Sequence, residues 1–250
     1  MSRTSVLTLL LAGPLQSWGA SSRFTRRTTE SAPTKSAVIG LLAAAAGIDR
    51  DDDTRLAPLA ALRFGVRIDQ PGIRIRDFHK AMHPVTGKTM PLSERFYLAD
   101  AVFVAAVEGD HTLLTGLHQA LRTPVYPPFL GRRSCPPSRP VDLGLHEDAR
   151  IEDILEHVPW QAAAWYRRHH RATLPNRLTV LREKHTGEDA AGDTLPDQPV
   201  SFSPTRRRHT LRTVVTTFVP GPTASTTQPQ QAVHHDPFDA LPALPEDENA

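Results

Sequence analysis

Cysteine and long apolar runs are the scarcest features of this sequence. The 250 residues contain a single cysteine, Cys135, which excludes an internal disulfide bond and any zinc site built from several cysteines. No apolar stretch approaches membrane-spanning length, and the first residues lack the basic, apolar and small-residue series of a secretory signal. We therefore expect a cytoplasmic protein that has no membrane partner.

Motifs of known catalytic machinery are scarce as well. The sequence has neither the Gly-x-Ser-x-Gly elbow of serine hydrolases nor a phosphate loop of the Walker type. His79 and His83 stand four residues apart, as in a helical zinc pair, but Lys80 occupies the position that zinc proteases fill with glutamate. No third ligand is evident, so we predict no metal, no cofactor and no small-molecule substrate.

Charge is distributed unevenly along the chain, although the net charge is only +2. Residues 1–140 hold 18 Lys and Arg against 11 Asp and Glu, whereas residues 141–200 hold 7 against 11. Residues 201–219 add four arginines and no acid, and residues 220–250 carry five acids and no base. Two basic segments separated by an acidic one favour a polyanionic partner.

A proline-rich loop, Tyr126–Pro137, holds the most distinctive chemistry. Its four prolines fix φ and remove backbone donors, so it is neither a helix nor a central strand. Adjacent arginine forks suit phosphate oxygens, a glycine permits close approach of a ligand, and a tyrosine gives a stacking face. A rigid, solvated surface turn is the alternative. The candidate contacts are Tyr126, Gly131, Arg132, Arg133 and Ser134.

The hydrophobic pattern predicts an α+β protein. Strands are predicted at 5–12, 62–68 (half exposed) and 101–107, and helices at 37–46 and 111–122. This order fits a ferredoxin-like, RRM-like β-α-β-β-α-β domain. Thr34 or Ser36 is the predicted N-cap of the first helix, whose N-terminus is either an anion site or simply a capped core helix.

Three further segments are predicted beyond that core pattern. An insertion at about 70–98 interleaves basic and aromatic residues, including Arg76, Phe78 and His79, which suits single-stranded RNA. Residues 146–219 are predicted to form a small C-terminal lobe after the 1–145 domain, with strands at 177–181 and 211–219. A second aromatic and basic cluster lies at 165–171. Residues 220–250 are predicted to be a disordered, acidic, Pro-rich tail.

Three sequence blocks resemble the CasD family of the RAMP superfamily, the Cas-five subunit of the type I-E CRISPR surveillance complex Cascade. They are Leu-Ala-Gly-Pro-Leu-Gln-Ser-Trp-Gly at 11–19, Pro-Thr-Lys-Ser-Ala-Val-Ile-Gly-Leu-Leu at 33–42, and Leu-Gly-Arg-Arg-Ser-Cys-Pro at 130–136. The resemblance implies a non-catalytic, antiviral subunit that holds the 5′ handle of the CRISPR RNA and extends a β-hairpin thumb. It also implies contacts with a backbone subunit and the large subunit, and with target DNA only through the complex.

The resemblance and the loop chemistry together define a predicted RNA-binding set. Its members are Gln16, Trp18, Arg26, Arg27, Thr34, Lys35, Ser36, Arg76, Phe78, His79, Tyr126, Gly131, Arg132, Arg133 and Ser134. For Trp18, a place in the core is an equal alternative to a contact with RNA.

An endoribonuclease is the alternative function. The related type I-C branch cleaves repeat RNA without metal, and Tyr97, Tyr126, His79 and Lys80 could supply a general base, a general acid and phosphate stabilisation. The type I-E pattern argues against this role, because a separate subunit processes the transcript there. The sequence also shows no close acid and base constellation. We therefore predict RNA binding without catalysis.

Overall fold

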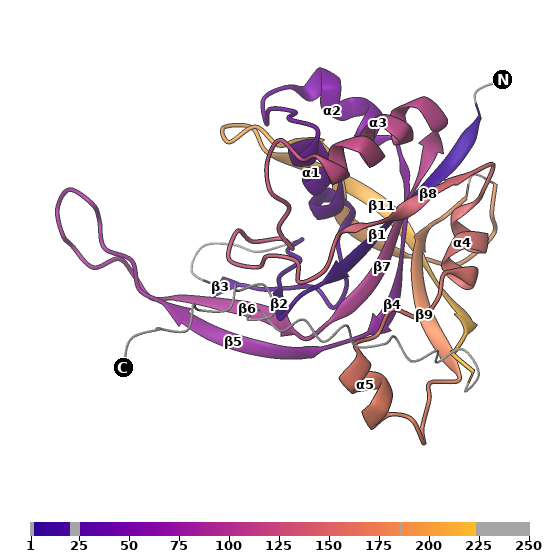
Figure 1. Ribbon diagram of the computed structural model, residues 1–250. Coiled ribbons are helices and arrows are strands. Elements are labelled where there is room, and N and C mark those ends of the chain that lie inside the picture. The colour runs from indigo at the N-terminus through magenta and orange to yellow at the C-terminus, as the bar shows by residue number, and fades with distance from the viewer. Residues whose placement is uncertain (1–2, 21–25, 186, 224–250) are drawn as a thin grey trace, which may run out of the picture.

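The computed structural model describes residues 3–20, 26–185 and 187–223, and its centre is a seven-stranded antiparallel sheet (Figure 1). The strand order is β10-β11-β9-β4-β7-β1-β8. The strands are β1 (Thr4–Ala12), β4 (Arg63–Gln70), β7 (Val102–Asp110), β8 (Asp142–Glu147), β9 (Arg177–Glu183), β10 (Asp193–Ser201) and β11 (Arg208–Pro220). The helices are α1 (Lys35–Ala45), α2 (Asp53–Ala60), α3 (His111–Arg122), α4 (Ile151–His157) and α5 (Ala164–His169).

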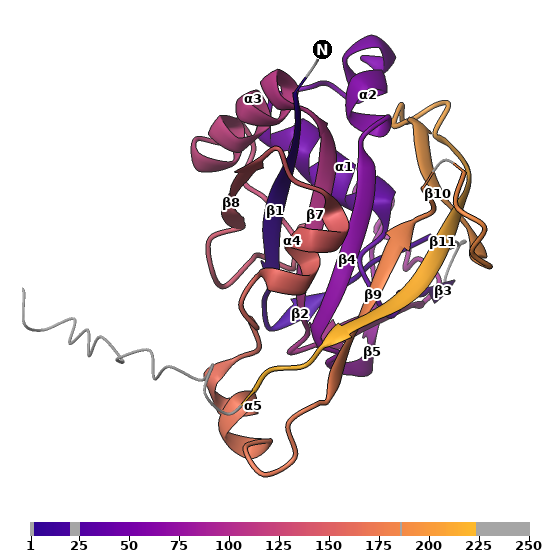
Figure 2. The ribbon, with the colours of Figure 1, turned by 90° about the vertical axis from the view of Figure 1, so that its right-hand side faces the viewer.

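Helices cover both faces of this sheet. Figure 2 shows its strands side by side, with α4 in front of them and α1 behind. Leu7, Leu9 and Leu11 of β1 point into the larger core, which they share with α1 and α3, whereas Val6 packs against α4. Because both faces are covered, the apolar run of β1 is nearly continuous rather than alternating, and the strand predicted at 5–12 is confirmed.

β4 is more buried than its sequence pattern predicts. Arg67, at an expected exposed position, is only 1% exposed. Its guanidinium donates to the Asp69 carboxylate at 2.7 and 3.1 Å and to three backbone carbonyls at the end of α4 and just beyond it. The prediction of a half-exposed strand was therefore wrong, because α4 and its following turn cover this face.

The N-terminus of α1 already holds a carboxylate from within the chain. Asp197 of β10 accepts a hydrogen bond from the Lys35 amide at 2.8 Å and two from Arg212 at 2.6 and 2.9 Å. Lys35 is itself 3% exposed, its ammonium lies 2.8 Å from Glu183, and burial lowers the pKa of this lysine. Thr34 is the N-cap residue but makes no side-chain capping bond. We call this cluster the Asp197 network. Because a carboxylate of the same chain binds the N-terminus of α1, this helix is a core helix and not a site for an external anion.

The last three strands continue the sheet outward from β4. β9 pairs with β4, β11 with β9 and β10 with β11. The predicted strands at 177–181 and 211–219 are confirmed as parts of β9 and β11, while β10 was missed because Pro196 and Pro199 interrupt it. It tolerates them at the sheet edge, where its register shifts twice. Most of the predicted tail, residues 224–250, lies outside the described residues.

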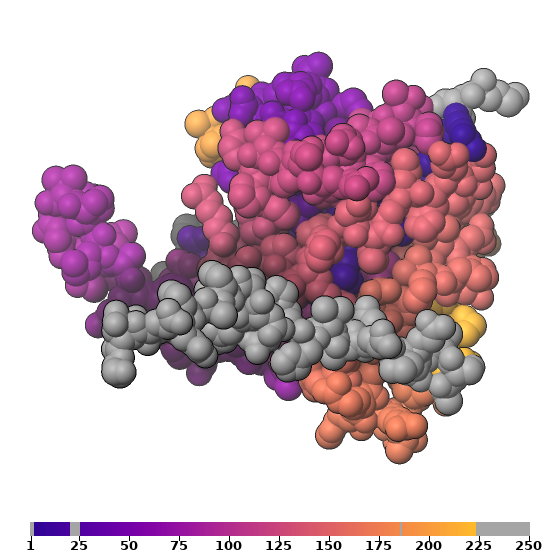
Figure 3. Space-filling model, viewed as in Figure 1, coloured from indigo at the N-terminus to yellow at the C-terminus, as the bar shows by residue number. Residues whose placement is uncertain are grey.

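A second, smaller sheet carries the insertion predicted at 70–98. It consists of β2 (Leu15–Gln16), β3 (Arg26–Arg27), β5 (Ile73–His79) and β6 (Ser93–Ala99). β5 and β6 form a long antiparallel hairpin whose tip projects from the body of the molecule (Figures 1 and 3). None of the helices in the described ranges is long and apolar enough to cross a membrane.

Candidate nucleic-acid interface

The proline-rich loop is anchored to the protein by its own backbone. Leu130 accepts a hydrogen bond from the Ser17 amide at 3.1 Å and donates one to the Cys135 carbonyl at 2.7 Å. The Cys135 amide in turn donates to the Arg132 carbonyl at 2.9 Å, and both Leu130 and Cys135 are buried. Burial raises the pKa of the Cys135 thiol. The loop is therefore a closed turn with an apolar base, which presents Arg133 and Ser134 to solvent.

Gly131 is required by a contact within the chain. Its φ is +83°, and a Cβ added there would lie 1.8 Å from the Ser17 carbonyl oxygen. The sequence predicted that this glycine permits the close approach of a ligand. In the structure, the group that approaches it is the Ser17 backbone. Gly131 thus sets the position of the arginines that follow it.

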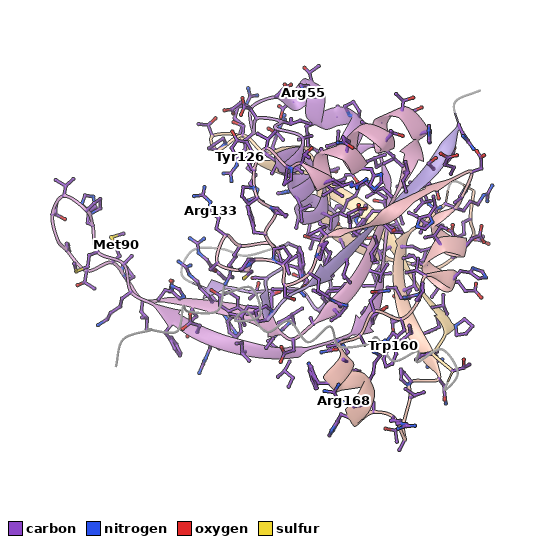
Figure 4. The ribbon with its side chains drawn as sticks, in the orientation of Figure 1. Arg55, Met90, Tyr126, Arg133, Trp160 and Arg168 are labelled. Carbon is purple, nitrogen blue, oxygen red and sulfur yellow. The ribbon has the colours of Figure 1, made fainter. Side chains whose placement is uncertain are left out.

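The two adjacent arginines have different environments. The Arg132 guanidinium lies 4.6 Å from the Tyr97 ring centre and donates from Nη2 to the Arg27 carbonyl at 3.0 Å. It therefore ties the loop to β3 and β6. Arg133 is exposed, and its side chain points outward from the loop (Figure 4). Of the pair, Arg133 is the one whose fork is free to meet a phosphate.

One face of the hairpin sheet gathers arginines and aromatic rings. The register pairs Arg76 with Phe96, and both Phe78 and Arg26 with Glu94, so these five side chains share a face. The Arg26 guanidinium lies 5.4 Å from the Phe96 ring centre, and that of Arg76 lies 4.9 Å from the Phe78 ring centre. Phe78 is 48% exposed. We call Arg26, Arg76, Phe78 and Phe96 the arginine–aromatic face.

The opposite face of the hairpin holds the remaining predicted contacts. Arg27 and Tyr97 lie at its base, under Arg132, and His79 lies towards the tip, where its ring is paired with Asp77. The register therefore splits the predicted hairpin residues between two faces.

Five members of the predicted set lie inside the protein. The Trp18 indole donates to Gln16 at 3.1 Å, and the Gln16 amide donates to the carbonyls of Leu11 and Ala101 at 3.1 and 2.7 Å. These bonds satisfy both side chains within the core. The buried members are Gln16, Trp18, Thr34, Lys35 and Ser36.

The structure does not bring the four candidate nuclease residues together. Tyr97 is 3% exposed, and the register separates it from His79 by four residues, or about 13 Å along the strand. Lys80 follows His79 towards the hairpin tip, whereas Tyr126 lies near α1, above Arg133 in Figure 4. Within the described ranges, no group of three or more His, Cys, Asp and Glu is placed to hold a metal ion.

Comparison with known proteins identifies the family of this chain. A family model described as "CRISPR-associated protein (Cas_Cas5)" matches residues 6–215. The chain belongs to this Cas5 family. It is 35% identical over 158 residues to the CRISPR system Cascade subunit CasD of Escherichia coli (strain K12), which is 56% of this chain and 70% of CasD. The predicted resemblance to the CasD family is confirmed.

Two solved structures have a similar fold. One, described as the crystal structure of a Cas protein, aligns with a TM-score of 0.66 and 37% identity over 86% of this chain and 95% of that chain. Another, from a CRISPR RNA-guided surveillance complex, aligns with a TM-score of 0.65 and 31% identity over 86% and 91% of the respective chains.

Phe96 is the residue of the arginine–aromatic face that the predicted set omits. The pattern Glu-Arg-Phe-Tyr-Leu at 94–98 resembles a strand, and the pattern Arg-Ile-Arg-Asp-Phe at 74–78 precedes it. Pairing the two segments as a hairpin would have placed Phe96 opposite Arg76.

Proposed function

We propose that this Cas5 family member is a non-catalytic subunit of a type I-E Cascade complex and binds the 5′ handle of the CRISPR RNA. The arginine–aromatic face of the projecting hairpin carries the proposal, because it joins two guanidinium groups to two rings on one accessible surface. Arginine pairs with phosphates and rings stack on bases, and neither contact requires a particular sequence. Arg133 adds a separate exposed guanidinium, on the loop that lies over the opposite face of the hairpin.

The architecture suits a guide-holding role. The connection β1-α1-β4-β7-α3-β8 and the strand order β4-β7-β1-β8 support a ferredoxin-like core, and the β5–β6 hairpin is the proposed thumb. Its tip projects from the body (Figure 3), and we propose that it meets a neighbouring backbone subunit as well as RNA. We propose the large subunit as the other protein partner, target DNA as a ligand only through the complex, and a cytoplasmic location.

RNA retention by the assembled complex tests this assignment. Replacing Arg76 and Arg133 with alanine should lower the RNA retained after a salt wash, because two phosphate partners are lost. Removing two contacts should also reduce the slope of log affinity against log salt concentration by about 1.4 in magnitude. The measurement is the RNA bound per complex at increasing salt concentration.

A matched control removes the same charge elsewhere. Arg55 of α2 and Arg122 of α3 are exposed, and α2 lies far from the hairpin (Figure 4). Replacing both with alanine should leave retention unchanged. Equal RNA content in the two variants, at every salt concentration, would refute the proposed handle interface.

The absence of cleavage is a separate expectation. Labelled CRISPR repeat RNA incubated with the folded protein in EDTA should remain intact on a denaturing gel, because Tyr97 is buried and distant from His79. A discrete product that disappears in His79→Ala would instead establish a metal-independent endoribonuclease.

A further inference from the structure

A second cluster of basic and aromatic residues surrounds α5, on a part of the surface that the proposed handle interface does not use. Residues 158–182 contain no aspartate or glutamate. Trp165 is 49% exposed, and Arg168, Arg171 and Arg177 are exposed as well. We call Trp165, Arg167, Arg168, Arg171 and Arg177 the α5 patch.

The arginines of this patch have no carboxylate partners in the described part of the chain. Other arginines of the protein do: Arg3, Arg63, Arg67, Arg182 and Arg212 each lie within 4.0 Å of an acidic side chain. Burial, and then the charge of Arg167, lower the pKa of neighbouring Arg139, although the buried Asp69 carboxylate acts in the opposite direction. A concentration of exposed positive charge of this kind attracts anions.

Aromatic packing holds Trp165 in place. Tyr166 lies between Trp165 and Trp160, with ring centres 5.6 and 6.3 Å away, and its ring centre is 4.2 Å from that of His170. The Trp160 indole donates to the Asp69 carbonyl at 2.9 Å, which fixes the cluster to the end of β4. The exposed indole of Trp165 is therefore supported from behind by other rings.

We propose that the α5 patch is a second nucleic-acid site, which binds single-stranded nucleic acid by phosphate contacts and by stacking of a base on Trp165. Exposed arginines beside a supported aromatic face are the combination that single-strand binding proteins use. The site is separate from the handle interface, since Arg168 and Arg133 lie on opposite sides of the hairpin base in Figure 4. It does not depend on the handle assignment.

The acidic C-terminal segment is the alternative occupant that the test has to distinguish from nucleic acid. Pro220 pairs with Arg177, and the Gly221 amide donates to the Asn176 carbonyl at 2.9 Å, so the chain leaves the sheet beside the patch. The residues that follow include Asp236, Asp239, Glu246, Asp247 and Glu248. A tethered acid segment has a high effective concentration and competes with a free ligand.

Tryptophan fluorescence of the full chain, titrated with a short oligouridylate, tests the proposal. Trp18 is buried and Trp160 is half-buried, so a stacked base should quench mainly Trp165. Replacing Trp165 with phenylalanine should keep binding, measured by anisotropy of the labelled oligonucleotide, and remove the quenching. Replacing it with alanine should weaken binding roughly tenfold. The double variant Arg168→Gln and Arg171→Gln should reduce the slope of log affinity against log salt concentration by about 1.4 in magnitude. The control variant Arg55→Gln with Arg122→Gln should leave this slope unchanged.

Three outcomes would overturn the proposal. The first is equal affinity of the patch variant and the control variant. The second is loss of quenching in Arg76→Ala with Phe78→Ala, which would place the oligonucleotide on the hairpin instead. The third is binding that appears only when the chain ends at residue 223, which would show that the acidic segment occupies the patch in the intact protein.

Discussion

Replacing Asp197 with alanine should lower the free energy of unfolding by about 3–5 kcal/mol, because it leaves buried positive charge without its partner. Arg212 would lose both hydrogen bonds to the carboxylate, and the first amide of α1 would lose its acceptor. Lys35 keeps Glu183, but the network would then hold two cations and one anion. Urea denaturation of the purified protein measures the change.

Asp193 provides the matched control for this prediction. It is an exposed aspartate at the start of the same strand, so Asp193→Ala should change stability by no more than about 0.5 kcal/mol. Asp197→Asn keeps the shape of the side chain and loses its charge, so its loss of stability should lie between those of Asp197→Ala and Asp193→Ala. If Asp197→Ala and the control unfold at the same urea concentration, the Asp197 carboxylate does not stabilise the N-terminus of α1.

Gly131→Ala should be the most damaging small change in the proline-rich loop. A left-handed φ costs a residue with a Cβ about 1–2 kcal/mol, and displacement of the loop would also remove the hydrogen bond from Ser17 to Leu130, worth about 1 kcal/mol. The loop would have to move away from Ser17, and Arg132 would lose its place over Tyr97. We expect lower stability by about 3 kcal/mol, together with weaker RNA retention.

Gly116 of α3 is the control for the glycine change. Nothing lies within 4 Å of the position where its Cβ would be, so Gly116→Ala should leave stability unchanged or raise it by up to about 1 kcal/mol. Thermal unfolding and RNA retention should be measured on both variants. Normal retention by Gly131→Ala would show that the position of Arg132 and Arg133 does not matter for binding.

Helices and strands with a clear hydrophobic pattern in their own residues were predictable from the sequence. β1 has a nearly continuous apolar run and α3 has a helical stripe of leucines, and both lie where the pattern predicts them. The burial of β4 was not predictable, because the partners of Arg67 on α4 and its turn lie about ninety residues away. The anion at α1 is still more distant in sequence, because the numbers of Lys35 and Asp197 differ by 162.

In the candidate site, too, the sequence predicted which residue types are present but not how they are oriented. The sequence singled out Arg132 and Arg133 as a pair, but only the Tyr97 ring reveals that one of them faces inward. Likewise, the interleaving of basic and aromatic residues in the insertion was visible, whereas the choice of face depends on the hairpin register. Charge and ring content are local properties, but orientation depends on contacts between distant segments.

The continuation of the central sheet beyond β4 limits how the protein can be shortened. A fragment stopped at residue 145 would keep β1, α1, β4, β7 and α3, yet it would lose β9 and expose the edge of β4 from Gly65 to Ile68. An open edge with apolar neighbours is a template for intermolecular pairing. Such a fragment should self-associate, so the C-terminal strands protect the sheet from aggregation by covering the edge of β4.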